Sequence, residues 1–350
     1  MITLPRSCLD TLRESVTTLC SQHHTTLKKW RALLGTMHGA TTALYGGEHL
    51  FSILQHAFQS AKRNRITLTA LLKAIFHDWL VLADTMTQYP VPIHVLVPRA
   101  SDLVTATDAS RDGMGGFWLQ PSLHTPQPIL VLWRTTFDTD IQSQLITATN
   151  PTGTITNSNL ELAAIIMGTS LTNHHLPIAH PSILIASDNI PAVTWCKKGS
   201  TSSTTSAAFL LPHFANTRCA APFTVQPLYI PGHTNQIADC CSRLLHLPDD
   251  TFLAYMNQHF PVHPSWTLVR PPKEQLLLMK SALFRKLPWL AFPQELSGPE
   301  TPHGPYGKTS ALTSTKTPHW PILMIPFHFC NFCSAIPIGR SRSQWQSSKF

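Results

Sequence analysis

The order of strand-like and helix-like segments between about residues 100 and 245 limits the folds open to this chain more than any other feature. Three segments rich in β-branched and aromatic residues come first, bounded by Gly, Pro or polar residues: "DLVTATD", "GGFWLQ" and "PILVLWRTTF". The helix-like "SNLELAAIIMGTSL" then precedes the apolar run "PSILIASDN", which is typical of a buried strand. Two short helical segments, the strand "FTVQPLYIPG" and the closing helix "NQIADCCSRLL" follow. The order predicts a mixed α/β sheet flanked by helices.

The segment before this region, residues 1–90, has a helical pattern. Leu27, Trp30, Leu34 and Met37 recur at the spacing of one helix face. A small helical bundle explains the pattern, but the basic residues of this segment leave open a contact with a phosphate backbone. These residues are Lys28, Lys29, Arg31, Lys62, Arg63 and Arg65.

The C-terminal part carries weaker signals. Residues 249–295 are predicted to be a helical extension. Residues 296–350 are rich in Pro, Ser, Thr and Gly, and we expect a low-complexity, disordered tail. Cys330 and Cys333 have metal-type spacing but lack the second ligand pair of a closed zinc site. The apolar run at 320–338 is interrupted by polar residues and a proline, so it is a poor candidate for a membrane span.

The cysteines and the net charge indicate the cellular compartment and the kind of partner. The eight cysteines show no disulfide-framework spacing, and the first residues contain no apolar segment of a secretory signal. We therefore expect an intracellular protein, in the cytoplasm or nucleus, that is not secreted and has no membrane partner. The 26 Lys and Arg exceed the 18 Asp and Glu, which gives a formal net charge of +8. This balance favours a polyanionic partner such as nucleic acid.

Four of the scarce carboxylates occupy positions where they can converge. Asp108 ends the first strand and Asp188 ends the buried strand, so the two meet at one sheet edge if those strands are parallel neighbours. Glu161 and Asp239 each lie in the first turn of a predicted helix. Four converging carboxylates cannot all stay ionised without a cation. Oxygen-only ligands suit Mg²⁺ or Mn²⁺, and two such ions about 4 Å apart are the usual device for phosphodiester cleavage.

Each carboxylate also has a structural interpretation. Ser158-x-x-Glu161 has the pattern of a capping box, in which Glu161 only bonds a backbone N–H. Asp239 can complement a helix macrodipole, and Asp108 and Asp188 can form turns or caps. The glycines after Asp108 are interpreted as the residues that let the chain turn into the second strand.

Four blocks of this region together resemble a known family. "TDAS" with its following glycines, "NLELAA", "ASDN" and "YIPGHTNQIADCCSR" look like the signature blocks of the ribonuclease H domain of retrotransposon reverse transcriptases, with the greatest likeness to gypsy-type and DIRS-type elements. The last block is the most specific, and it consists of Pro231, Gly232, Asn235, Ala238, Asp239, Ser242 and Arg243. The likeness covers residues 100–248, and residues 20–90 are similar to the thumb region of such polyproteins. No polymerase Y-x-D-D motif is present.

The resemblance implies a fold, an activity and a set of residues. The fold would be a ribonuclease H-like mixed sheet of five strands, preceded by thumb-like helices. The activity would be two-metal cleavage of the RNA strand of an RNA–DNA hybrid, with two Mg²⁺ ions (or Mn²⁺). Asp108, Glu161, Asp188 and Asp239 would be the catalytic residues and metal ligands. His233 would be an auxiliary residue.

The remaining implications concern nucleic acid and context. The nucleic-acid contacts would come from Ser110, Asn189, Lys197 and Lys198. The polymerase portion of the parent polyprotein would be a partner. Two alternatives stay open: a catalytically inactive nucleic-acid-binding remnant of a decayed element, and a relative of integrases or exonucleases, against which the "PGHTNQIAD" block argues.

Overall fold

The computed structural model describes residues 3–286 with several gaps. The gaps are positions 42, 45, 89, 91, 92, 94–96, 98, 99, 121–128, 176–180, 203, 204, 221 and 222. The expected low-complexity tail (296–350), with its cysteine pair and apolar run, lies outside the described residues. Within the described part, no helix combines the length and the apolar character needed to cross a membrane.

The N-terminal segment is helical, as predicted. Its elements are α1 (Arg6–Cys20), β1 (His24–Thr26), α2 (Leu27–Ala40), the 3₁₀ helix η1 (Gly47–Leu50), α3 (Phe51–Gln59), β2 (Arg65–Thr67) and α4 (Ala70–Gln88). Trp30 and Phe76 form the centre of its core, with ring centroids 5.2 Å apart in an edge-to-face contact. The strands β1 and β2 form an antiparallel ribbon, which the helical periodicity did not predict because each has only three residues.

The central sheet has six strands in the order β7-β6-β3-β4-β5-β8. Its strands are β3 (Leu103–Ala109), β4 (Gly113–Gln120), β5 (Ile129–Thr136), β6 (Ser182–Ser187), β7 (Thr224–Tyr229) and β8 (Thr267–Val269). The first three form an antiparallel meander, whereas β6 is parallel to β3 and β7 is parallel to β6. This is a ribonuclease H-like fold, and the strands that carry Asp108 and Asp188 are parallel neighbours, which is the condition for the two carboxylates to meet at one edge.

The strand count corrects the prediction of five. The additional strand, β8, lies in the segment 249–295 that was predicted to be only helical, between α11 (Asp249–His259) and α12 (Lys273–Leu283). It pairs in parallel with the edge strand β5, and the preceding Trp266 is buried, with its ring 6.0 Å from that of Phe117. A three-residue strand is too short to show a periodicity in the sequence. It forms here because β5 offers an edge with which it can pair.

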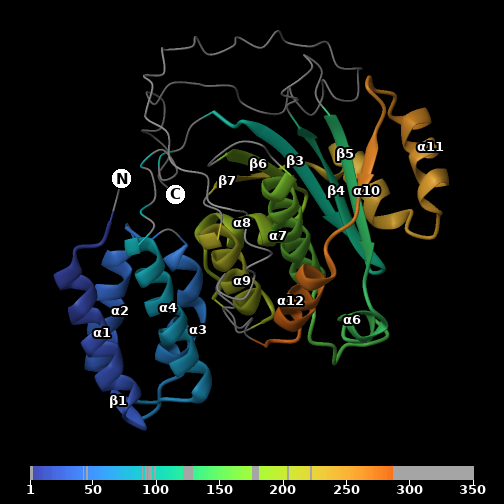
Figure 1. The fold of residues 1–350 in the computed structure, drawn as a ribbon. Coiled ribbons are helices and arrows are strands. Elements are labelled where there is room, and N and C mark those ends of the chain that lie inside the picture. The colour runs from blue at the N-terminus through green and yellow to red at the C-terminus, as the bar shows by residue number, and fades with distance from the viewer. Residues whose placement is uncertain are drawn as a thin grey trace, which may run out of the picture. The chain divides into compact units, whose positions relative to one another are not determined.

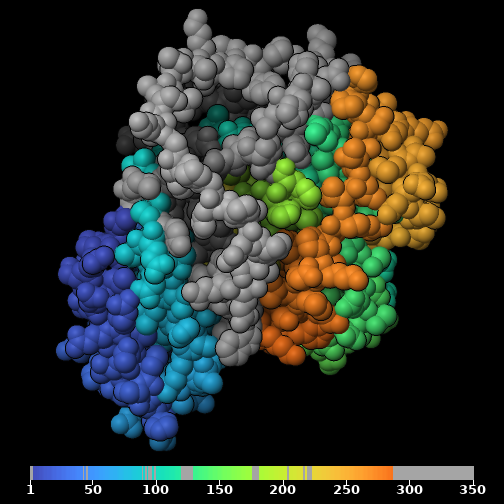
Figure 2. Space-filling model, viewed as in Figure 1, coloured from blue at the N-terminus to red at the C-terminus, as the bar shows by residue number. Residues whose placement is uncertain are grey.

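The segment after β8 also packs on the α/β region. Lys280 of α12 bonds Asp138 and Asp140, at 2.7 and 2.9 Å, in the Thr-rich insertion that contains α6 (Thr139–Ser143). Figure 2 shows the orange surface of α12 beside the green surface of this insertion. Residues Met1–Leu290 form one compact unit, which includes both the helical segment and the sheet.

Helices cover both faces of the sheet and carry two of the predicted carboxylates (Figure 1). They are α7 (Asn157–His175), α8 (Ile190–Lys198), α9 (Ala207–Ala220) and α10 (Gln236–Arg243). Gly168 of α7 lies against Thr107, whereas the Cys241 side chain of α10 lies against Gly115, the residue paired with Asp108. Since Thr107 and Asp108 point to opposite faces of β3, α7 and α10 lie on opposite faces.

The glycines after Asp108 serve a different purpose from the predicted one. Gly115 is part of the extended strand β4, not of a turn, and a Cβ atom there would lie 2.5 Å from the Cβ of Cys241. The missing side chain therefore lets α10 approach the sheet, which brings the last sequence block close to Asp108.

Candidate active site

The ends of two parallel strands bring the first two carboxylates together. Ala106 of β3 lies opposite Ala186 of β6, so Asp108 and Asp188, each two residues further on, lie at the same sheet edge. Glu161 reaches this edge from α7. One ligand oxygen from each of Asp108, Glu161 and Asp188 lies within 4.8 Å of the other two. Three of the four predicted residues therefore form one cluster that can hold a metal ion.

Glu161 is not used as a helix cap. The backbone N–H of Thr156 donates to Oδ1 of Asn159 at 3.0 Å, and the N–H of Asn159 donates to Oγ1 of Thr156 at 3.3 Å. This reciprocal pair is the capping box of α7, two residues ahead of the predicted Ser158–Glu161 pair. Glu161 consequently lies just beyond the first turn of α7, and the structural interpretation of this residue is wrong.

Asp188 is not a helix cap either. The side chain of Asn189 accepts a hydrogen bond from the backbone N–H of Ala192 at 3.0 Å and so forms the N-cap of α8. The loop after β7 passes close to Asp188, because a Cβ atom on Gly232 would lie 2.8 Å from Oδ2 of that carboxylate. The Pro-Gly pair of the last block therefore lets the backbone approach the Asp188 carboxylate.

Burial and the charges of neighbouring carboxylates raise the pKa values of all three carboxyl groups. Burial, together with the charges of Asp108 and Asp188, raises the pKa of Glu161 to about 9. Burial raises the pKa of Asp108 to about 6, against the hydrogen bond that Ser242 donates to it. Burial also raises the pKa of Asp188. A bound cation would oppose these shifts, since it would favour the ionised form of each group.

The donor set fits a divalent metal ion that prefers oxygen. Glu161 is only 3% exposed, yet its Oε2 has no hydrogen-bond partner. An unpartnered buried carboxylate oxygen is costly, and an ion among the three carboxylates would satisfy it. The cluster opens into a pocket of about 350 Å³, whose lining is Asp108, Ala109, Ser110, Arg111, Asn157, Glu161, Asp188, Asn189 and Arg243.

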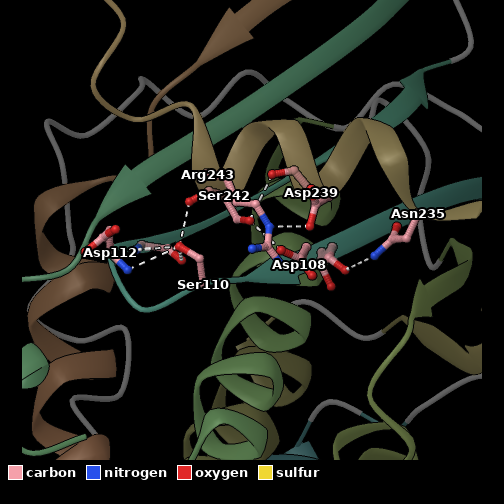
Figure 3. A network of polar contacts seen from close by, with 9 residues as sticks. Asp108, Ser110, Asp112, Asn235, Asp239, Ser242 and Arg243 are labelled. Carbon is pink, nitrogen blue, oxygen red and sulfur yellow. Dashed lines mark hydrogen bonds and ion pairs between the residues drawn. The ribbon is translucent and has the colours of Figure 1, made fainter. Parts of the chain in front are cut away.

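Asp239 lies beside this cluster without joining it. Its charge raises the pKa values of Asp108 and Asp188, so it is near both. Its Oδ1, however, accepts a hydrogen bond at 2.5 Å from Nε of Arg243, four residues along α10 (Figure 3). The structure thus brings three predicted ligands together and leaves the fourth paired with an arginine.

Two further residues of the last block position α10 against β3. Asn235 is buried at the start of the helix and donates from Nδ2 to the carbonyl oxygen of Thr107 at 3.0 Å (Figure 3). Ser242 is fully buried and donates to Oδ2 of Asp108. The sequence placed both residues in the last block but assigned them no role, although two polar residues at fixed spacing on either side of Asp239 were the available signal.

The other predicted site residues have varied surroundings. The Ser110 hydroxyl donates to the carbonyl of Ser242 at 2.7 Å and accepts the backbone N–H of Asp112, so it shapes the turn beneath the pocket. Asn189 lines the pocket beside its capping role. His233 is exposed in the 3₁₀ helix η2 (Gly232–Thr234), and the lysines at 197–198 are exposed in the last turn of α8.

The chain has distant likenesses to solved structures. No protein-family model matches it, and no curated protein matches it. The foamy viral protease-reverse transcriptase in complex with RNA/DNA hybrid is 13% identical, with a TM-score of 0.25, over 88% of this chain and 30% of that chain. The foamy viral protease-reverse transcriptase dRH in complex with double-stranded DNA is 14% identical, with a TM-score of 0.24, over 65% of this chain and 35% of that chain. This chain thus spans about a third of the length of those proteins, and likenesses at these values assign it no activity.

Proposed function

We propose that this chain is a ribonuclease H-type endonuclease that cleaves the RNA strand of an RNA–DNA hybrid and derives from a gypsy-type or DIRS-type retrotransposon polyprotein. The observation that carries the proposal is the cluster of Asp108, Glu161 and Asp188 with its unpartnered buried oxygen. The four signature blocks add the substrate class and the origin. An intracellular location and a polymerase partner from the same polyprotein belong to this proposal.

The roles of the residues are those that the resemblance implies. Asp108 would help to hold both ions, with Glu161 and Asp188 on one ion and Asp239 on the other, and the cluster of Asp108, Glu161 and Asp188 supports the first of these positions. Two Mg²⁺ ions, or Mn²⁺, would supply charge stabilisation and an activated water for in-line displacement. Ser242 fixes the orientation of the Asp108 carboxylate through its hydrogen bond. The products would carry 3′-hydroxyl and 5′-phosphate ends.

The basic residues of the N-terminal segment support a nucleic-acid partner. Lys62, Arg63 and Arg65 are exposed around the turn into β2, and Lys28 and Lys29 are exposed in the first turn of α2. Within the described residues, none of these five side chains takes part in an ion pair. The backbone bond from the N–H of residue 27 to the carbonyl of residue 64 brings the two groups together. Such a cluster suits a phosphate backbone.

The test uses the full chain with an end-labelled RNA–DNA hybrid and Mg²⁺. We expect cleavage of the RNA strand but not of double-stranded DNA, and a loss of about a hundredfold or more in Asp108→Asn. Asp140→Asn is the matched control, because it removes a carboxylate that pairs with Lys280 away from the site. Cleavage that survives Asp108→Asn contradicts the proposal. Salt-dependent hybrid binding without Mg²⁺-dependent cleavage supports instead an inactive nucleic-acid-binding remnant.

A further inference from the structure

The ion pair between Arg243 and Asp239 is exposed although it borders the metal-type cluster. The Arg243 side chain is 63% exposed and that of Asp239 is 42% exposed. An exposed pair at i,i+4 spacing on a helix contributes little to stability, so a competing partner can displace it at small cost.

The guanidinium group acts on more than Asp239. Arg243 lines the same pocket as Asp108, Glu161 and Asp188. Its positive charge lowers the pKa values of both Asp108 and Asp188, against the burial that raises them. Figure 3 shows the Arg243 side chain directed from α10 toward the carboxyl groups of Asp239 and Asp108. Arg243 therefore neutralises part of the charge that a divalent ion would neutralise.

The helix is fixed at both ends by buried hydrogen bonds, whereas the Arg243 side chain is held by one exposed ion pair. The Asn235 bond to Thr107 fixes the start of α10, and the Ser242 bond to Asp108 fixes its end. Asp239 lies between them on the same helix, and its Oδ1 accepts the hydrogen bond from Arg243. Rotation of the exposed Arg243 side chain would break this contact and free the oxygen for another partner.

We propose that Arg243 is an internal counter-ion that holds Asp239 in the metal-free protein and releases it when a divalent ion binds between Asp239 and Asp108. Arg243 is thus a positioning residue that sets the affinity of the second metal position. The inference rests on the proposed function, because it assigns a control of ion binding to the same site.

The first test measures Mn²⁺ affinity calorimetrically on the full chain and on two variants. Arg243→Gln removes the counter-ion. Arg111→Gln is the matched control, because Arg111 is an exposed cation that lines the same pocket, whereas the ion pair with Asp239 belongs to Arg243. We expect the second, more weakly bound Mn²⁺ ion to bind Arg243→Gln about two- to fivefold more tightly than it binds Arg111→Gln. Both variants lose one positive charge, so the comparison removes the effect of net charge. Equal affinities overturn the inference.

The second test observes the Arg243 side chain directly. In protein labelled with ¹⁵N-arginine, the Nε–H signal that is absent from Arg243→Gln reports on the pair with Asp239. We expect this signal to shift on Mg²⁺ addition, and an unmoved signal at saturating Mg²⁺ overturns the inference. If the unmodified chain neither binds Mn²⁺ nor cleaves hybrid, the proposed function fails as well. If it does both while the variants behave alike, only the role of Arg243 fails.

Discussion

Replacing Glu161 by Gln is expected to stabilise the metal-free protein. Glu161 is 3% exposed, one of its carboxyl oxygens has no partner among the described residues, and the ligand oxygens of Asp108 and Asp188 lie within 4.8 Å of its own. Ionisation of Glu161 therefore costs free energy in the folded state that it does not cost in the unfolded chain. An amide of the same shape cannot ionise, so Glu161→Gln escapes this cost.

The magnitude follows from the pKa of this group. Burial and the neighbouring charges raise the pKa of Glu161 from its ordinary value of 4.5 to about 9 in the folded protein. The folded state then binds more protons between these values, so stability is lost as the pH rises from 4.5 to about 9. A pH of about 7 lies roughly 2.5 pH units above 4.5, and each unit lowers the free energy of unfolding by about 1.4 kcal/mol. We expect Glu161→Gln to gain about 3 kcal/mol, or roughly 6–12 °C in Tm.

The assay is thermal unfolding in EDTA and in Mg²⁺ at several pH values. Asp239→Asn is the control, because it removes a charge from the same neighbourhood where Arg243 already compensates it, and we expect it to lose no more than about 1 kcal/mol. In Mg²⁺ the order reverses, since only the unmodified chain gains the full binding energy. If Glu161→Gln is less stable than the unmodified chain in EDTA at neutral pH, the reasoning about burial and repulsion is refuted.

Three further predictions concern packing, pH and nucleic-acid binding. Gly115→Ala should lower the free energy of unfolding in urea by about 1–3 kcal/mol, because its Cβ would lie 2.5 Å from that of Cys241. Gly35→Ala, whose Cβ would have nothing within 4 Å, should raise it by up to about 1 kcal/mol. Equal values for the two variants contradict the close approach of α10. Burial lowers the pKa of His213 from 6.5 to about 4 in the folded protein. Between these values the unfolded chain binds the proton and the folded protein does not, so the free energy of unfolding falls by about 3 kcal/mol as the pH drops from 6.5 to about 4. His213→Leu should flatten that part of a plot of Tm against pH, and an unchanged slope rejects the assignment. Replacing the three cations at 62–65 by Ser should weaken hybrid binding and reduce its salt slope by up to about 3; an unchanged slope excludes this surface.

The sequence predicted the elements of the sheet well, because local periodicity determines them. The strand-like "DLVTATD" and the apolar run "PSILIASDN" became β3 and β6, and these strands pair in parallel, which was the condition for Asp108 and Asp188 to meet. It did not predict β8, whose three residues carry no periodicity and which forms a strand only because β5 offers an unpaired edge.

The candidate site was predicted in kind but not in detail. The sequence predicted that four carboxylates converge, and the structure brings Asp108, Glu161 and Asp188 together but leaves Asp239 outside the cluster. The sequence could not decide whether Glu161 and Asp188 are metal ligands or helix caps, because the local residue patterns at 158–161 and 188–189 fit both roles. Capping is decided by which residue has the N-cap backbone geometry, and this depends on how the chain enters each helix.

The sequence by itself determined the order of the elements, the positive charge and the positions of four carboxylates at strand ends and helix starts, because these depend on neighbours along the chain. Only the tertiary structure decided that Thr156 and Asn189 cap the two helices and free Glu161 and Asp188, and that Asp239 pairs with Arg243. It also decided that one oxygen of Glu161 is buried without a partner. Burial and repulsion between carboxylates depend on distances through space, and these distances exist only once the sheet and its helices have packed.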